Sequence, residues 1–520
     1  MANTIIEKVS LNFTDLTGAK TGCTTLGSNK FWTGWVEDVG SGIFNFECRW
    51  GSTGTPGKDK GSKRGISETM ARKTLASKVK SKEKKGYTKL ETRNLAAEQA
   101  KAKAAGVTTP KAAPKTVKKT APAPTRTFEP EVEHLLGVIY NETSKAVRSG
   151  LSAQAGATED NPIGNLSDRQ LDLGGEILDE IETLLVSHFG HETRGNKTET
   201  LPLGANGVPT APVIDVTNRF MSNIPRAIDR AMRGRSNLHR LVVSSFERLE
   251  AQRKFLQLLR DAHLTKGIFA AAAAAGPAST SKAGIWYDGL GCDIEFCAPG
   301  TTDFKRVEDI FNTSQSKRNA NWFRGGRSIL RVAKVFKFVR QNTEAAYQKF
   351  AAEMAAKRGA TGEIMAWHGT RTPNLLGIGK SGLLMPENLP RGVHVSGKAF
   401  GRGIYHAPAW NATNTDKVGT HRTDGTNGAL KSMNYTSARG AYYGNTNTAS
   451  GAFMFLQDVA LGLGEVRSTA CWDKRRPDKF PTHDFIYANA GKCSSLSHDE
   501  LVTFDENAQM FRYLVEIEVR

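Results

Sequence analysis

The chain has 520 residues, 39% of them apolar, which is enough for several domains with hydrophobic cores. Its 71 lysines and arginines outnumber 52 aspartates and glutamates, giving a formal net charge of +19. An excess of this size favours a polyanionic partner, nucleic acid before an acidic membrane, although a basic surface without such a partner is also compatible with it.

Several classes of protein are disfavoured at the outset. The six cysteines include no C-x-x-C pair, which argues against a disulfide framework and a zinc site. The longest apolar run, residues 268–275, is mostly alanine and far shorter than the ~18 residues of a membrane span. The first residues carry no basic and apolar leader. We therefore expect a soluble, intracellular protein that binds neither a membrane nor a metal.

Residues 1–95 predict a small α/β module. Alternating apolar and polar residues over 31–36 and 43–50 indicate strands separated by glycines. A glycine-rich turn follows, and then a helix for which Ser67 is a suitable N-cap. This helix carries Lys78 and Lys80 and gives the module a basic edge.

The composition changes over residues 96–126 to alanine, lysine, proline and threonine. No apolar residue larger than valine occurs there, so the segment cannot form a core. We predict a basic linker.

Residues 127–268 predict an all-α domain. Ser167 and Gln170 have the spacing of a capping box. Ile177, Ile181 and Leu184 then share one helical face. After Ser236 the apolar spacing predicts one long helix, and core packing is the simplest explanation for both apolar stripes.

Residues 277–520 return to strands, predicted at 329–339, 453–461 and 511–519. An alanine-rich helix ends at Gly359, a good residue just beyond a helix C-terminus. Long loops rich in glycine, serine, threonine and asparagine separate these elements and are candidates for function.

Four polar segments at strand ends stand out in this last region. They contain His368-Gly369, then Tyr405 in G-R-G-I-Y-H, then Ser432 and Tyr435 in L-K-S-M-N-Y, and Glu500 in S-H-D-E-L-V-T-F-D. Each residue taken singly also fits a structural role, as a core histidine, a sheet aromatic or an exposed carboxylate.

In this order the four segments resemble the catalytic domain of poly(ADP-ribose) polymerases. F-N-F-E-C-R-W-G-S-T-G-T-P-G and K-K-G-Y resemble the WGR module of that family. N-P-I-G-N-L-S-D-R-Q and V-I-D-V-T-N-R-F-M-S-N-I-P resemble its helical regulatory domain. The resemblance implies a multidomain α+β protein: a WGR module (1–95), a linker (96–126), a helical domain (127–268) and a mainly antiparallel β transferase domain (277–520).

The resemblance also implies roles in binding NAD, the ADP-ribose donor. His368 bonds a ribose hydroxyl, and the Gly369 backbone with the Ser432 hydroxyl holds the nicotinamide carboxamide. A backbone N–H and C=O pair suits a carboxamide, and glycine permits a close approach. Tyr405 and Tyr435 sandwich the nicotinamide ring, each aromatic contact contributing ~0.5–1.5 kcal/mol beyond area burial.

Glu500 is the residue that the resemblance implies for the chemistry. Breaking the nicotinamide–ribose bond develops oxocarbenium character, and hydrogen bonds to a sugar 2-hydroxyl strengthen in such a transition state. Because the cationic nicotinamide is a good leaving group, one carboxylate suffices. His368, Tyr405 and Glu500 together are therefore the expected catalytic set, and a glutamate at this position favours polymer over single-unit transfer.

The resemblance assigns the basic N-terminal module to DNA ends and nicks. Trp50 and Tyr87 match positions that lie against nucleic acid, and Lys78 and Lys80 are candidate phosphate contacts; a core role for Trp50 fits its sequence equally well. The helical domain is expected to cover the NAD site until DNA docking loosens it. The signature Trp-Gly-Arg is Trp50-Gly51-Ser52 here, so the arginine that connects domains in relatives is absent.

The expected function is DNA-break-activated poly(ADP-ribosyl) transfer from NAD to the protein itself and to other proteins, in DNA repair. The expected enzyme is a monomer, nuclear if the host is a eukaryote and cytoplasmic otherwise. Two alternatives remain: an enzyme limited to single ADP-ribose transfer, and a DNA-end-binding scaffold with an inactive transferase domain. The complete set of His368, Tyr405 and Glu500 argues against the scaffold.

Overall fold

The computed structural model describes most of the chain. The described residues are 4–16, 27–91, 127–155, 166–190, 198–201, 203–204, 208–209, 211–228, 238–274, 281–314, 330–359, 362–389, 399–409, 428–443, 451–467, 483–488, 496 and 498–519. The predicted linker lies outside them. Two compact units make up the chain: residues 1–111, 145–267 and 390–394 form the first, and residues 112–144, 268–389 and 395–520 form the second.

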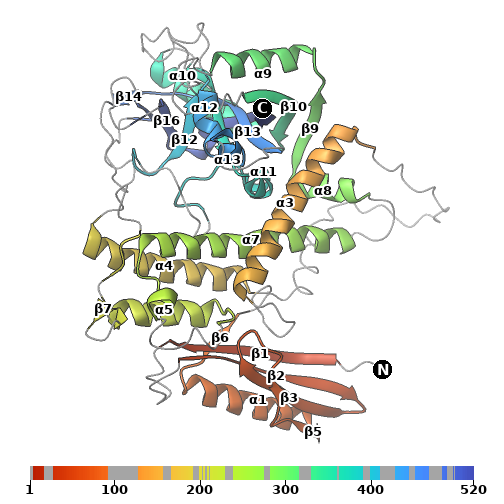
Figure 1. Ribbon diagram of the computed structural model, residues 1–520. Helices are drawn as coiled ribbons and strands as arrows, with labels where there is room; N and C mark the ends of the chain where they lie inside the picture. The colour runs from red at the N-terminus through yellow and green to blue at the C-terminus, as the bar shows by residue number, and fades with distance from the viewer. Residues whose placement is uncertain are drawn as a thin grey trace, which may run out of the picture. The chain divides into compact units, whose positions relative to one another are not determined.

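An antiparallel sheet opens the first unit (Figure 1). Its strands are β1 (Thr4–Asp15), β2 (Ser28–Gly40), β3 (Ile43–Ser52), β4 (Lys58–Asp59), β5 (Lys63–Ile66) and β6 (Thr88–Leu90). Within the described residues they run in the order β4-β3-β2-β1-β6, with β5 also paired to β3. The helix α1 (Glu68–Glu83) begins at Ser67, whose side chain accepts a hydrogen bond from the Met70 amide. The predicted N-cap is confirmed.

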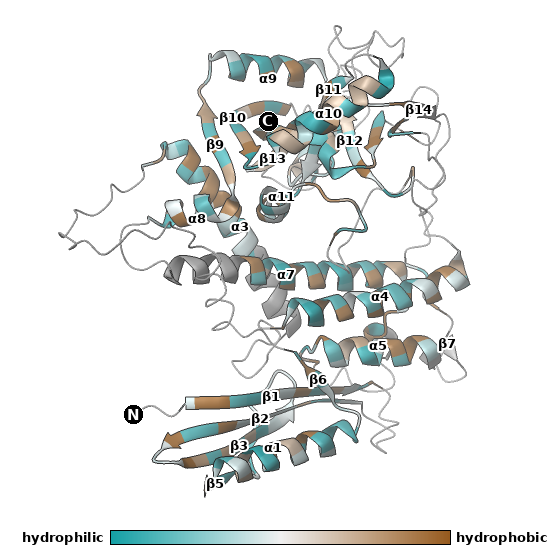
Figure 2. Ribbon diagram, turned by 180° about the vertical axis from the view of Figure 1, so that it is seen from behind, coloured by the Kyte–Doolittle hydropathy of each residue, from teal (hydrophilic) through white to brown (hydrophobic). Residues whose placement is uncertain are grey.

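The two faces of this sheet differ in chemistry. On the face covered by α1, Trp32 and Phe46 pack with Leu75 of the helix. Figure 2 shows hydrophobic and hydrophilic residues alternating along these strands, as expected when successive side chains point to opposite faces. The other face buries polar residues, among them Asn12 and Thr14.

Helices complete the first unit. They are α4 (Asp168–Phe189), α5 (Ala211–Asn223), α6 (Leu238–Leu241) and α7 (Phe246–Ala274) up to residue 267, and β7 (Leu203–Gly204) pairs with β8 (Val208–Pro209). In Figure 1 α4 lies alongside both α5 and α7, and buried side chains of these three helices form one core. The predicted face of Ile177, Ile181 and Leu184 is confirmed, with Leu184 only partly buried.

Two predictions about these helices are wrong in part. The single helix expected after Ser236, a residue outside those described, is two helices, because the chain leaves the helix at Val242 and restarts after Ser245. Ser245 then receives the amides of Arg248 and Leu249, so it acts as the cap of α7.

The capping box at the start of α4 is only half formed. Ser167 does accept the Gln170 amide, but the Gln170 side chain does not return to the Ser167 backbone. Instead, Gln170 accepts a hydrogen bond from the Glu91 amide and donates to Asn223 of α5. A side chain with one carbonyl and one amino group thus connects the sheet end to the helices.

The second unit holds a sheet in which, among the described residues, nine strands run β14-β15-β16-β12-β11-β13-β17-β10-β9. These strands are β9 (Cys292–Cys297), β10 (Leu330–Arg340), β11 (Glu363–Thr370), β12 (Ile404–Pro408), β13 (Ala452–Ala460), β14 (Gly464–Arg467), β15 (Phe485–Ala488), β16 (Glu500–Thr503) and β17 (Gln509–Val519). In the described part of this sheet, β14 and β15 are the one parallel pair. The predicted multidomain α+β class is confirmed.

The helices of the second unit are α8 (Lys282–Leu290), α9 (Thr302–Thr313), α10 (Glu344–Arg358), α11 (Leu375–Ser381), α12 (Gly428–Met433) and α13 (Arg439–Tyr442). The first part of α3 (Pro130–Ala155), up to residue 144, also belongs to it. The alanine-rich helix α10 ends at Gly359, in the left-handed conformation with φ 72°, as predicted. No helix within the described residues is long and apolar enough to cross a membrane.

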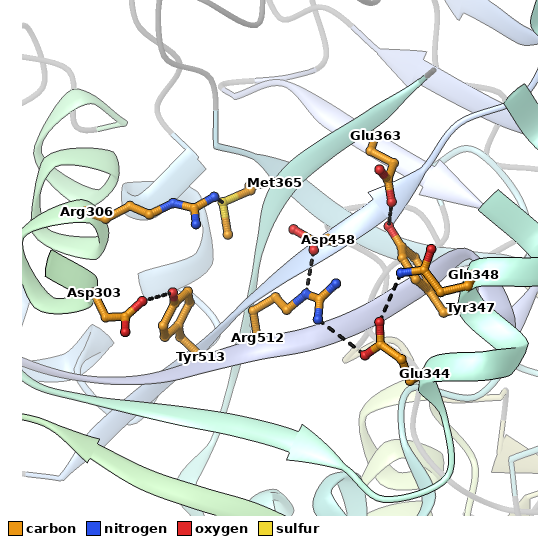
Figure 3. A network of polar contacts seen from close by, with 10 residues as sticks. All are labelled: Asp303, Arg306, Glu344, Tyr347, Gln348, Glu363, Met365, Asp458, Arg512 and Tyr513. Carbon is orange, nitrogen blue, oxygen red and sulfur yellow. Dashed lines mark hydrogen bonds and ion pairs between the residues drawn. The ribbon is translucent and has the colours of Figure 1, made fainter. Parts of the chain in front are cut away.

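Polar contacts fasten α9 and α10 to one face of this sheet (Figure 3). Tyr513 of β17 donates to Asp303 of α9 at 2.6 Å, and Tyr347 of α10 donates to Glu363 of β11 at 2.7 Å. Met365 of β11 belongs to this face as well. Because side chains alternate along a strand, His368 points to the opposite face.

Candidate active site and nucleic-acid interface

The backbone of Gly369 lies against α12. A Cβ atom placed on Gly369 would come within 1.8 Å of the Ser432 carbonyl oxygen. The two backbones can approach this closely only because residue 369 has no side chain. The Ser432 side chain is buried beside it. These two predicted ligands of a carboxamide therefore lie next to each other, although 63 positions separate them in the sequence.

His368 is tied to the strand that carries Tyr405. The His368 Nδ1 atom lies 3.0 Å from the Tyr405 carbonyl oxygen, so Nδ1 carries the proton and Nε2 is left as an acceptor. Burial lowers the pKa of His368, with the bond to Tyr405 opposing it. The Tyr405 side chain is also fixed in place, because its hydroxyl donates a hydrogen bond to the Gly401 carbonyl and accepts one from the Phe400 amide.

Glu500 begins β16, the strand next to β12. Lys431 of α12 places its Nζ atom 2.5 Å from Glu500 Oε1, and both side chains are nearly buried. The pKa of Lys431 is lowered by burial, an effect that the Glu500 charge opposes. The second oxygen, Oε2, is buried and has no hydrogen-bond partner among the described residues. It is an acceptor available for a ligand hydroxyl.

The structure therefore joins the predicted catalytic residues through short connections. His368 contacts Tyr405 on β12, β12 pairs with the strand of Glu500, and Lys431 links Glu500 to the helix of Ser432. Lys431 was missed by the sequence reasoning. The signal was its position: a lysine directly beside Ser432, a predicted ligand, and between the apolar residues Leu430 and Met433.

Tyr435 lies in the turn after α12, where its amide donates to the Ser432 carbonyl, and 43% of its surface is exposed. Its position beside the backbone predicted to bind a carboxamide is compatible with the predicted ring contact. The sandwich of a nicotinamide ring between Tyr405 and Tyr435 stays a prediction.

The face of the N-terminal sheet that carries α1 is basic and aromatic at the end of that helix. Trp50 is 40% exposed and shares this face with Phe46 and Cys48, so a core role does not describe it; the buried tryptophan is its cross-strand partner Trp32. Tyr87 stacks on Phe13 with ring centroids 5.3 Å apart, and Lys82 Nζ lies 5.0 Å from the Tyr87 ring.

Four lysines accompany these aromatic rings. Burial lowers the pKa of Lys82, and the positive charges of Lys85, Lys30 and Lys78 lower it further. Lys80 is exposed but projects from a different side of α1, since residues two apart on a helix do not face the same way. We call Lys30, Trp50, Lys78, Lys82, Lys85 and Tyr87 the basic–aromatic face.

The opposite face of the same sheet packs on α5 and the residues just after it through a polar seam. The Thr14 and Leu16 amides donate to the side chains of Ser222 and Asn218, and the side chains of Asn12 and Asn29 donate to the carbonyls of Met221 and Arg226. Thr53 donates to the Asn12 side chain at 2.8 Å, and Asn12 donates to the Met221 carbonyl at 3.1 Å. Thr53 follows Ser52, the residue that replaces the signature arginine. Buried amides that satisfy one another in this way fix the geometry between sheet and helix.

Three family descriptions match the chain. "WGR domain" matches residues 7–94, "Poly(ADP-ribose) polymerase, regulatory domain" matches 127–278, and "Poly(ADP-ribose) polymerase catalytic domain" matches 301–418. The last range includes His368, Gly369 and Tyr405 and stops before Ser432 and Glu500.

Curated relatives are similar over parts of their length. Poly [ADP-ribose] polymerase 1 of Arabidopsis thaliana is 25% identical over 247 residues, covering 47% of this chain and 20% of the relative. Poly [ADP-ribose] polymerase 1 of Oryza sativa subsp. japonica is 23% identical over 414 residues, 75% of this chain and 35% of the relative. The Gallus gallus protein of the same name is 26% identical over 248 residues, 47% and 20% respectively. The matched part of the chain thus spans a fifth to about a third of the length of these relatives.

Proposed function

This chain belongs to the poly(ADP-ribose) polymerase family and carries its WGR, regulatory and NAD⁺ ADP-ribosyltransferase catalytic domains, and from that premise we propose that it is a DNA-break-activated poly(ADP-ribosyl)transferase. The observation that carries the proposal is the buried Lys431–Glu500 pair, which leaves one carboxylate oxygen without a partner beside β12, the strand of Tyr405 that His368 contacts. NAD is the donor substrate, and the acceptors are proteins, this chain included.

The residues of the site fit NAD in three respects. The backbone of Gly369, which has no side chain, and the neighbouring Ser432 hydroxyl suit a carboxamide, which offers one acceptor and two donors. The free Nε2 atom of His368 suits a ribose hydroxyl. The unpaired Oε2 atom of Glu500 suits a second hydroxyl. Bound NAD supplies the ADP-ribosyl group together with a leaving group that departs without a general acid.

Glu500 stabilises the charge that develops on the ribose. A carboxylate that accepts a hydrogen bond from a sugar 2-hydroxyl stabilises an oxocarbenium-like transition state more than the ground state, by several kcal/mol in glycosidases. Lys431 holds that carboxylate in place through the ion pair with Oε1. The same carboxylate, after nicotinamide has left, can orient an acceptor hydroxyl for elongation.

DNA breaks are the proposed activator. The basic–aromatic face combines cations for phosphates with rings for exposed bases, the combination that unpaired DNA ends require. The polar seam on the other side of the same sheet offers a route from DNA to the helices that needs no arginine at position 52. Binding would then shift the population of the regulatory helices, which is how we account for activation.

The proposed domains are those expected from the sequence: 1–95, 96–126, 127–268 and 277–520. The two structural units divide the chain differently, since the first part of α3 belongs with the catalytic sheet. A nuclear setting in a eukaryotic host, a role in DNA repair, autoinhibition by the helices and a monomeric state complete the proposal.

One experiment tests the proposal directly. The full chain is incubated with labelled NAD, with and without nicked duplex DNA, and nicotinamide release and product length are measured. We expect long labelled products on the protein itself, and more of them with nicked DNA. Equal rates with and without nicked DNA would refute activation by breaks. Single-unit products would indicate a mono-ADP-ribosyltransferase, and no nicotinamide release would indicate a scaffold.

A further inference from the structure

His406, the neighbour of Tyr405 on β12, is a buried histidine that the proposed mechanism does not use. Only 2% of its surface is exposed. Its Nδ1 atom lies 2.5 Å from the Gln457 side-chain nitrogen on β13, and its Nε2 atom lies 3.0 Å from the Thr503 hydroxyl on β16. One imidazole therefore connects three strands of the catalytic sheet.

The direction of these hydrogen bonds can be followed along the chain of contacts. Gln457 donates to Nδ1 of His406, so the imidazole proton is on Nε2 and is donated to Thr503. Thr503 then donates to Gln509 at 3.2 Å, and Gln509 donates to the Glu506 carbonyl at 2.7 Å. Every link has one donor and one acceptor when His406 is neutral. Burial, followed by the charges of His368 and Lys431, holds the pKa of His406 well below 6.5.

The strand β12 depends on such side-chain contacts more than its neighbours do. Among the described residues it pairs with β11 only at Ala366–Pro408 and Trp367–Ala407, and with β16 only over Ile404–His406. The adjacent β11–β13 pair extends from Glu363 to Thr370. Because β12 has few ladder pairs, side-chain contacts form a larger share of what holds it to the rest of the sheet.

A displacement of β12 would change the positions of both His368 and Glu500. The Tyr405 carbonyl on β12 fixes the His368 ring, and β16 begins with Glu500. His406 also lies near His368, with ring centroids 6.5 Å apart. The imidazole of His406 thus sets the spacing between the residue proposed to hold ribose and the carboxylate proposed to act on it.

We propose that His406 is a positioning residue of the transferase reaction: through Gln457 and Thr503 it locks β12 between β13 and β16 and so fixes His368 relative to Glu500. This inference rests on the proposed function. An aromatic or aliphatic residue of similar size could fill the same volume, but it would leave the amide of Gln457 and the hydroxyl of Thr503 without their imidazole partner.

The test uses the full chain with NAD and nicked DNA and measures kcat and KM for nicotinamide release. We expect His406→Phe to lower kcat at least about tenfold, because displacements of ~1 Å can cost ~100-fold in rate, and to change KM for NAD less than about twofold. Thr503→Val removes one partner without altering residue 406 and should lower kcat in the same direction. His406→Gln keeps a donor near Thr503 and should recover part of the loss.

The outcomes separate the inference from the function on which it rests. If the wild-type protein releases no nicotinamide, the proposed function fails and the positioning role fails with it. If the wild type is active and both His406→Phe and Thr503→Val keep its kcat, or if KM rises while kcat stays, only the positioning role is wrong. Should His406→Phe fail to fold, as judged by its melting temperature, Thr503→Val alone decides. The double variant should be no slower than the slower single variant.

Discussion

On the N-terminal sheet the candidate DNA contacts Trp50 and Lys78 are exposed, whereas in the catalytic unit Lys431 and Glu500 are nearly buried and paired with each other. Exposed cations act over a distance, are screened by salt and contribute nearly independently. Buried groups act at contact, are insensitive to salt and depend on their partners. The two regions should therefore respond to substitution in different ways, and this contrast can be tested residue by residue.

The largest effect is expected for Glu500→Gln. The amide keeps the shape of the carboxylate but lacks its charge, so the transition state loses several kcal/mol of stabilisation and the rate should fall by more than about 100-fold. Polymer should be absent from a gel while NAD binding, followed by calorimetry, stays measurable. Undiminished polymer synthesis would overturn the assignment of Glu500.

Lys431→Met should be the most destabilising of the substitutions considered. It leaves the Glu500 carboxylate buried without its counter-ion, and breaking a buried pair in this way costs roughly 3–5 kcal/mol. Chemical denaturation should report this loss at low and at high salt alike. Lys431→Arg, which retains the charge, serves as the control; a loss confined to low salt would mean that the pair is effectively exposed.

Acid should destabilise the catalytic sheet selectively. Burial lowers the pKa of His368, His406 and His498, the last to about 4, whereas residues 1–95 contain no histidine. The unfolded chain binds protons below pH about 6.5 that the folded unit does not, so stability should fall as the pH falls from about 6.5 to about 4. Hydrogen exchange at several pH values can follow the two sheets separately. Equal losses of protection from exchange in the two sheets would contradict the expectation.

Asn12→Ala should uncouple DNA from catalysis at a moderate cost. It leaves the Thr53 hydroxyl and the Met221 carbonyl without their partner, a loss of about 1–3 kcal/mol. We expect the basal rate of nicotinamide release to stay near wild type and the stimulation by nicked DNA to shrink. Thr33→Val is the matched control, since Thr33 is buried on the same face but contacts Ser10 of the sheet. Full stimulation in Asn12→Ala would exclude the polar seam as a coupling route.

The smallest effects belong to single lysines. Lys78→Gln should weaken DNA binding and reduce the slope of log affinity against log salt by ~0.7–0.9, with little effect on folding. Lys80→Gln is a matched comparison two residues away, and we expect a smaller change because its side chain leaves α1 on another side. Fluorescence anisotropy over a salt series measures both. Equal slopes for the two variants would mean that Lys80 contacts DNA as Lys78 does and belongs to the basic–aromatic face.

Local signals in the sequence predicted the elements well. Ser67 and Ser167 mark helix starts because a cap is a contact over three residues, and Ile177 with Ile181 marks a buried face because the helical period is local. The missed break at residues 242–245 combines a local cap, Ser245, with a distant partner, Thr217, whose hydroxyl accepts the Val243 amide. No local rule could supply that partner.

The candidate site shows the same limit. His368, Gly369, Tyr405 and Glu500 stand out by chemical type and by resemblance, but Lys431 becomes visible only when α12 is placed beside β16. His406 stands beside Tyr405 in the sequence, and its importance depends on Gln457 and Thr503, which lie 51 and 97 positions away. Partners brought together by sheet order are what single-sequence reasoning cannot supply.

The contact between Gly369 and the Ser432 carbonyl has a consequence for the evolution of this chain. At 1.8 Å even a methyl group cannot be accommodated by a rotamer change, because both sides of the contact are backbone. A saturation library selected for transfer should return glycine alone at this codon. Position 369 would thus serve as an internal reference that tolerates no substitution, and the tolerance of other positions to substitution can be ranked against it.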